Sequence, residues 1–357
     1  MNVPLPHQAR WLGETPIYVI GAALMALCIG LLAARGIYPT AGGIWVNARL
    51  FFMFLLGIGA IDAGWQLFKQ RPESPLGHLK ARYSSPQFKG IAIAGLPLLG
   101  VCIVLLPFFS KMKAAIPLFT EYTWDNAFIE WDRALFFGYD AWEIMQPVLG
   151  FPIVTGFLAL LYHLWFLLLY PGVLFLAFAN VDRGVQRQFF LSYLLSWTVI
   201  GGAMATWLAS VGPCFVGPML GDSRFDDQMT YLYSANEQVP IMTLGVQEML
   251  LEWFNADADG LGSGITAMPS MHVAIAFLYW LAMRRISPKL GLLFGAFCLI
   301  TWISSVHLAY HYAVDGLVSV VAVSLIWMTS KWVIGAWDRF LDSRHQATLR
   351  TNTVPAE

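Results

Sequence analysis

The chain is far richer in apolar residues than a soluble protein of its size. Of its 357 residues, 58% are hydrophobic and only 12% are charged, whereas a soluble domain averages about 45–50% apolar and about 25% charged residues. This balance excludes a disordered chain, a coiled coil and a cytosolic enzyme, because too little charge remains to cover a water-facing surface. The net charge of −1 also argues against nucleic acid as a partner, since no basic face is left to neutralise phosphates.

Long apolar runs follow one another along the chain. A bilayer offers no partners to backbone N–H and C=O groups, so each run of about 20 residues is predicted to be a helix. Eight such runs lie at residues 17–34, 44–68, 91–109, 154–179, 189–211, 265–283, 290–307 and 310–334. The predicted fold is therefore all-α, a polytopic membrane helix bundle with about eight transmembrane helices.

Basic residues gather in the connections that follow every second run. They lie between runs 2 and 3, 4 and 5, and 6 and 7, and after run 8, which makes that side cytoplasmic by the positive-inside rule. The other side receives two long segments, residues 110–153 and 212–264. The second segment has a single basic residue, Arg224, and many more acidic ones: Asp222, Asp226, Asp227, Glu237, Glu248, Glu252, Asp257 and Asp259. We expect an integral protein of a bacterial inner membrane with both segments in the periplasm.

The first outer segment contains aromatic residues at near-helical spacing. Between residues 121 and 146, Trp124, Phe128, Trp131 and Trp142 alternate with acidic residues. This pattern is typical of an amphipathic helix that lies in the membrane interface. A simple lid packed on the bundle would explain it equally well.

Three histidines, His272, His307 and His311, fall near helix ends at the outer boundary. Ionisable side chains are costly at this depth, so they usually mark a functional site or a buried pair. Pro269 suits the first turn of a helix, which would leave the N–H groups of residues 270–272 pointing outward. Such a helix N-terminus is a ready anion site, and phosphate is its common occupant.

His311 and Asp315 are four residues apart, so on a helix their side chains would meet. A carboxylate on one imidazole nitrogen fixes the tautomer and leaves the other nitrogen as a nucleophile or base. His311 would then attack phosphorus, while His272 would protonate the leaving alkoxide. A structural pair that joins two helices would explain the same spacing.

Together, residues 269–272 and residues 311–315 resemble the motifs of the phosphatidic acid phosphatase type 2 superfamily. Its Pro-Ser-x-His motif matches residues 269–272, and its second motif, ending in His-x-x-x-Asp, matches residues 311–315. The sequence is most similar to the inositolphosphotransferase branch, the relatives of inositol phosphorylceramide synthase, which residues 132–138, 162–163 and 213–218 also resemble.

The resemblance covers residues 125–316 and implies a role for several residues. His311 resembles the nucleophile that forms a phosphohistidine, Asp315 its orienting acid, and His272 the general acid. Ser270 matches the serine that contacts phosphate, and Met271 stands where the family's phosphatases have glycine. No metal and no cofactor are implied.

Two cationic positions of the family pattern are missing. Ser305 stands where the phosphatases have an arginine six residues before the nucleophile, and Gly217 and Pro218 lie roughly where a Lys-x₆-Arg-Pro motif would be. The sphingolipid-type transferases also lack the arginine, which favours transfer over hydrolysis. Arg49 and Arg224 are the candidates to supply charge to a bound phosphate, although for Arg49 a carboxylate or carbonyl at the headgroup level is the favoured partner.

Two other functions are compatible with the sequence. His307, His311 and Asp315 share one helical stripe, so a metal-dependent membrane hydrolase is possible. A non-enzymatic lipid transporter is the third class, although it would place charges near the midplane rather than at one face.

The favoured interpretation is a metal-independent membrane enzyme, a lipid phosphotransferase or phosphatase. Its partners would be a phospholipid donor and a lipid, sugar or water acceptor. We expect three parts: an N-terminal three-helix membrane extension (1–110), a catalytic membrane domain with a six-helix core (111–338) and a polar cytoplasmic tail (339–357).

Overall fold

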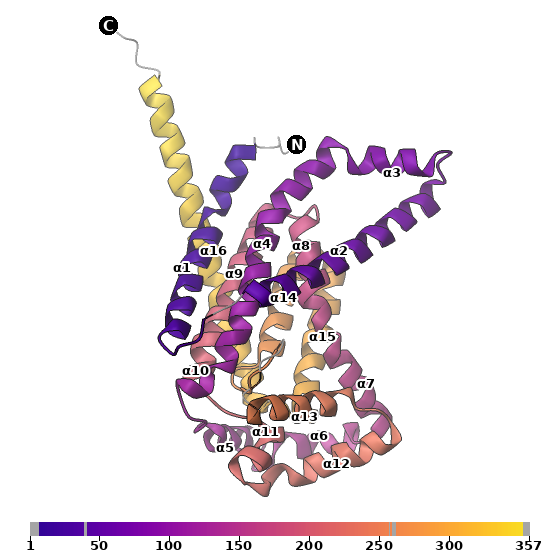
Figure 1. Ribbon diagram of the computed structural model, residues 1–357, viewed down its shortest axis with the longest axis vertical. Helices are drawn as coiled ribbons and strands as arrows, with labels where there is room; N and C mark the ends of the chain where they lie inside the picture. Colours follow the sequence, from indigo (N-terminus) through magenta and orange to yellow (C-terminus); the bar gives the residue numbers. More distant parts are fainter. Residues whose placement is uncertain (1–6, 39–40, 257, 259–261, 353–357) are drawn as a thin grey trace.

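Every regular element in the described part of the chain is a helix. The structure, a computed structural model, describes residues 7–38, 41–256, 258 and 262–352; Asp257 and Asp259 of the acidic outer segment lie outside it. Long helices stand side by side as a bundle, and shorter helices gather at the end opposite the chain termini (Figure 1). The all-α prediction is confirmed.

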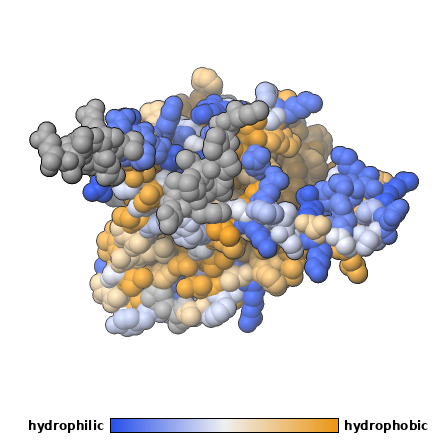
Figure 2. Space-filling model, turned by 90° about the horizontal axis from the view of Figure 1, so that it is seen from above, coloured by the Kyte–Doolittle hydropathy of each residue, from blue (hydrophilic) through white to orange (hydrophobic). Residues whose placement is uncertain are grey.

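The bundle is formed by α1 (His7–Ala33), α2 (Ala41–Gln70), α4 (Pro86–Ala114), α7 (Pro152–His163), α8 (Val173–Phe178), α9 (Arg183–Leu195), α10 (Ala205–Trp207), α14 (Met271–Ile286), α15 (Pro288–His307) and α16 (Ala313–Asn352). Two π-helical segments continue these helices: η2 (Leu168–Gly172) leads directly into α8, and η3 (Ser196–Met204) follows directly on α9. Seven stretches in the described residues are long and apolar enough to cross a membrane. Seen from above, hydrophilic residues form patches, most densely on the part that projects to the right, and apolar residues lie between and below them (Figure 2).

The sixth predicted span differs from the structure. Its apolar run begins at residue 265, but helix α14 begins only at Met271 and has 16 residues. At 1.5 Å per residue the helix is roughly 24 Å long, shorter than the ~30 Å hydrocarbon core. Residues 265–270 instead form a buried connection, in which Ile265, Ala267 and Met268 are almost fully covered. Helix α14 is itself enclosed by its neighbours α9, α15 and α16.

Ion pairs join both α1 and α16 to α9. Glu14 of α1 pairs with Arg183 of α9 at 2.8 Å, and Arg187 of α9 pairs with Asp338 of α16 at 2.7 Å. Helix α16 continues through Asp338 to Asn352, so the start of the polar tail is helical.

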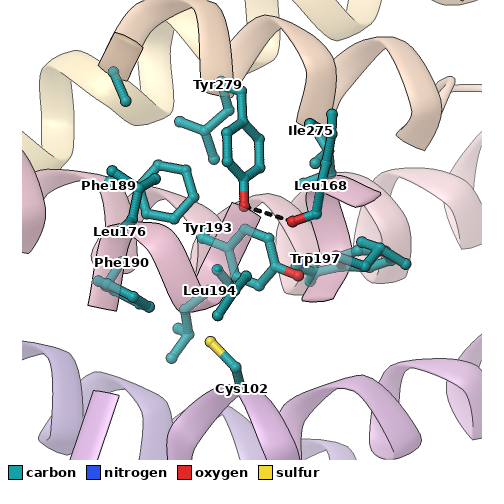
Figure 3. Close-up of a cluster of buried hydrophobic side chains, with 14 of the residues drawn as sticks. Cys102, Leu168, Leu176, Phe189, Phe190, Tyr193, Leu194, Trp197, Ile275 and Tyr279 are labelled. Atoms are coloured by element: carbon teal, nitrogen blue, oxygen red, sulfur yellow. Dashed lines mark hydrogen bonds between the residues drawn. The ribbon is translucent and has the colours of Figure 1, made fainter. Parts of the chain in front are cut away.

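The main hydrophobic core lies where α4, α9 and α14 meet. Tyr193 of α9 and Tyr279 of α14 are fully buried, and Cys102 of α4 faces them from the other side (Figure 3). The Tyr279 hydroxyl donates to the carbonyl of Leu168 in η2 (Figure 3). A polar group is thus satisfied inside the core, and α14 is fixed against the π-helical segment.

Short helices form a cap on the bundle: α5 (Asp125–Leu135), α6 (Ala141–Leu149), α12 (Asp226–Gln238) and α13 (Met242–Asn255). The remaining short elements are α3 (Pro75–Tyr83), which joins α2 to α4, η1 (Ile116–Leu118), α11 (Pro213–Phe215), η4 (Val216–Leu220) and η5 (Ser223–Phe225). The aromatic segment at 121–146 is therefore two helices rather than one. Phe128 and Ile129 of α5 are buried while Trp131 is exposed, a packing that agrees with a lid on the bundle.

Candidate active site

His311 lies in the short connection between α15 and α16. Its Nδ1 is 2.9 Å from Oδ2 of Asp315, in the first turn of α16, and the same oxygen accepts the N–H of Tyr312 at 3.1 Å. Both side chains are buried. With Nδ1 donating its proton to the carboxylate, Nε2 is left as the free nitrogen of the ring.

His272 lies at the N-terminal end of α14. Ser270 is the N-cap of this helix, and its Oγ accepts the N–H of Val273 at 3.4 Å. Pro269 therefore precedes the cap rather than standing in the first helical turn. The first-turn N–H groups of Met271 and His272 point away from the helix, as at any helix N-terminus.

The two histidine rings face each other across a short gap. Their centroids are 6.3 Å apart, with the rings inclined at 59°. The Ser319 hydroxyl contacts the carbonyls of both Ser270 (2.9 Å) and Asp315 (2.7 Å). Ser319 thus links the N-terminal ends of α14 and α16, the two helices whose starts carry His272 and Asp315.

Two aromatic rings hold His272 in place. Tyr162 stacks on it at 4.3 Å and 17°, and Trp165 lies 4.2 Å away at 36°. The indole N–H of Trp165 also donates to the His272 carbonyl at 3.0 Å. Few ring orientations remain open to His272, as a proton donor at a fixed position requires.

Two carboxylates of α5 hold the loops around His311. Asp132 accepts the N–H groups of Ala313 and Val314, both at 2.7 Å, and so caps the N-terminus of α16. Asp125 accepts the N–H groups of Val211 and Gly212 (about 3 Å) and the Tyr312 hydroxyl at 2.7 Å. Asp125 and Asp132 of the aromatic segment therefore face inward.

Replacing Asp132 with asparagine should weaken this support. The substitution replaces one carboxylate oxygen with an NH₂ group, which cannot accept a hydrogen bond. One buried N–H therefore loses a charge-assisted hydrogen bond worth about 2 kcal/mol. We expect a lower melting temperature in detergent and lower turnover. Glu130→Gln is the matched control, since Glu130 is on the same helix, 70% exposed, and 3.8 Å from Arg224. Equal behaviour of the two variants would contradict a supporting role for Asp132.

The histidines border a cavity of about 300 Å³ whose walls are mostly apolar. Lys113, Phe109 and Trp197 belong to its lining. A second, more apolar cavity of about 580 Å³ lies between α1, α4 and η3, and Phe109 and Trp197 line both. A charged reacting group could thus sit at the histidines while hydrocarbon lies against the rest of the wall.

Burial controls the protonation of His311. Removal from water lowers the pKa of its imidazole to about 3, and the positive charge of Lys113 adds to this effect, while the Ala267 backbone opposes it. The ring is therefore neutral from neutral pH down to mildly acidic pH, the form that a nucleophile requires.

Of the other residues expected at the site, Met271 lines this cavity, whereas Ser270, Arg49, Arg224, Gly217 and Pro218 do not. Arg49 is exposed on α2, and Arg224 lies 3.8 Å from Glu130. Gly217 and Pro218 are in η4 and do not contribute to the cavity lining among the described residues. The Ser270 hydroxyl is buried and caps its own helix.

His307 does not lie with His272 and His311. Its Nε2 is 2.9 Å from Thr155 Oγ1, and its ring packs near Tyr231. Within the described residues, no three His, Cys, Asp or Glu side chains are grouped so that they could hold a metal ion. The stripe of His307, His311 and Asp315 is also interrupted, because α15 ends at His307 and α16 begins at Ala313.

Residues 126–329 match the family model described as the PAP2 superfamily. No curated protein and no solved structure matches the chain.

Proposed function

This chain belongs to the PAP2 superfamily, whose members are phosphatases and phosphotransferases, and we propose that it transfers a phosphoryl or phosphodiester group from a phospholipid through a phosphohistidine at His311. The observation that carries the proposal is the buried His311–Asp315 pair, 2.9 Å apart, with the ring of His272 6.3 Å from that of His311. One imidazole is oriented as a nucleophile and a second is at hand for proton transfer.

The reaction has two steps. In the first, Nε2 of His311 attacks phosphorus, the bond from phosphorus to the leaving alcohol oxygen breaks, and His272 gives its proton to that oxygen. In the second, an acceptor hydroxyl attacks the phosphohistidine and gives its proton to His272, and the electron pair of the P–N bond returns to His311. Asp315 stabilises the charge on His311 throughout.

The acceptor we favour is an alcohol, on a lipid or a sugar, rather than water. Ser305 stands at the position of the phosphatases' arginine, and its hydroxyl donates to the Trp302 carbonyl at 2.7 Å. The mostly apolar cavity wall suits an amphiphilic substrate. We place the reaction on the periplasmic face of a bacterial inner membrane, since basic residues are concentrated in the opposite loops.

The purified protein should convert a labelled phospholipid into a transfer product when an alcohol acceptor is present. The assay uses a panel of glycerophospholipids, sphingolipids and polyprenyl phosphates, with and without diacylglycerol, ceramide and inositol, and identifies products by mass. Water as the sole acceptor would reduce the proposal to a phosphatase.

The same assay separates this mechanism from a metal hydrolase. Turnover should survive EDTA and be blocked by orthovanadate, which mimics a five-coordinate phosphorus. Loss of activity in EDTA with recovery on adding a divalent cation would contradict it, and no turnover of any donor would leave a non-enzymatic role as the better explanation.

A further inference from the structure

Phosphoryl transfer at this cavity needs fixed positive charge, because negative charge is spread over the phosphate oxygens in the transition state. Ser305 cannot supply it, and Arg49 and Arg224 do not belong to the cavity lining. Among the described residues that line the cavity, Lys113 is the one lysine or arginine.

Lys113 is in the last turn of α4, far in sequence from both histidine motifs. Its Nζ donates to the carbonyl of Gly262 at 3.5 Å, and no carboxylate of the described residues lies within ion-pair distance of it. A partly buried ammonium with a single long hydrogen bond retains donors for a further acceptor. An anion in the cavity would supply that acceptor.

The charge of Lys113 also reaches the imidazole of His311. It is one of the causes that lower the pKa of His311, so the ammonium is close enough to influence a ring on the same cavity wall. The backbone of Lys113 is also closely packed: a Cβ on Gly264 would lie 2.7 Å from backbone atoms of Lys113 and Ala114. The loop that leads to Pro269 thus packs directly on the turn that carries the lysine.

We propose that Lys113 binds the non-bridging phosphate oxygens of the substrate and supplies the charge that the missing arginine would otherwise provide. This inference rests on the proposed function. It assigns a contact with substrate to a helix that lies before the region matched to the family.

The test compares Lys113→Met, Lys113→Gln and Lys113→Arg with wild type. Methionine keeps the length without charge, glutamine can still donate to the Gly262 carbonyl, and arginine keeps the charge. Lys111→Met is the matched control, since Lys111 lies in the same helical turn but outside the cavity lining. The measurements are kcat/KM for the best phospholipid donor and the inhibition constant of orthovanadate.

Both neutral variants should lose at least about 100-fold in kcat/KM and bind vanadate roughly tenfold or more weakly, while Lys113→Arg and Lys111→Met stay near wild type. Removing the charge should also shift the acidic limb of kcat/KM to higher pH, because Lys113 lowers the pKa of His311. A lysine with a purely structural role would leave vanadate affinity unchanged, so vanadate binding is the measurement that identifies a contact with the phosphate oxygens. If the Lys113→Met variant does not fold, Lys113→Gln provides the same comparison.

A folded neutral variant with wild-type kcat/KM and vanadate affinity would overturn the assignment of Lys113 while leaving the phosphohistidine mechanism intact. If wild type itself turned over no phospholipid, the proposed function would fail instead. Vanadate binding to wild type and to the neutral variants would still report on the anion site in that case, and equal affinities would refute it.

Discussion

A His311→Ala variant should show no transfer above background, at least about 10³-fold below wild type, with every donor that the wild type uses. In the proposed mechanism the mutation removes the nitrogen that bonds to phosphorus, so neither step of the reaction can proceed. The measurement is initial rate by product mass, with the melting temperature in detergent as the test of folding. Because His311 is 6% exposed, its loss leaves a small cavity, and a modest fall in melting temperature is expected.

The covalent intermediate gives an independent measurement. Rapid mixing of wild type with a ³²P-labelled donor, followed by quenching in alkali, should leave label on the protein that is released by mild acid, as for a phosphoramidate. His311→Ala should carry no label, and His78→Ala, on helix α3 away from the cavity, should label as wild type. Substantial turnover by folded His311→Ala would end the phosphohistidine mechanism.

A His272→Ala variant should lose about 10²–10⁴-fold in turnover of natural donors, but its loss should depend on the leaving group. A phospholipid alcohol cannot leave without a proton, whereas 4-nitrophenolate can. With a 4-nitrophenyl phosphodiester donor we therefore expect a burst of one nitrophenol per enzyme, followed by slow turnover, because the second step still lacks its base. Stopped-flow absorbance measures both phases.

The contrast with His311→Ala makes this test specific. Without the nucleophile no burst is possible, whatever the leaving group. If His272→Ala were equally slow with both donors, His272 would be positioning the substrate rather than transferring a proton. If His272→Ala turned over natural donors at the wild-type rate, His272 would have no role in the mechanism.

Most of the bundle could be predicted from the sequence because hydropathy reports directly on burial in lipid. The exception at residues 265–270 has the same cause. Ile265, Ala267 and Met268 are apolar because they are buried within protein, and a hydropathy run cannot distinguish a buried connection from the start of a helix. The aromatic segment was ambiguous for a related reason, since Asp125 and Asp132 have the spacing of a solvent-facing stripe but point inward.

The candidate site was predictable where the chemistry is local. The contact between His311 and Asp315 was expected from their spacing, although His311 lies in the connection before α16 and not on the helix. The capping role of Ser270 was missed, because Pro269 was expected in the first turn of α14. Lys113 could not be found from local spacing. It lies 159 and 198 residues before the two histidines, at the end of an apolar run whose basic residues look like an ordinary helix terminus, and only the packing of α4 brings it to the cavity.

The shortness of α14 bears on how a substrate reaches the histidines. If its Arg284–Arg285 end is anchored at one bilayer surface, its other end stops about 6 Å short of the opposite boundary, so the reacting phosphorus is met below the plane of the neighbouring headgroups. The headgroup of a donor lipid would have to move several ångströms toward the bilayer centre, where contacts with protein replace part of its hydration. Thinner bilayers should ease that descent, which makes membrane thickness a determinant of turnover.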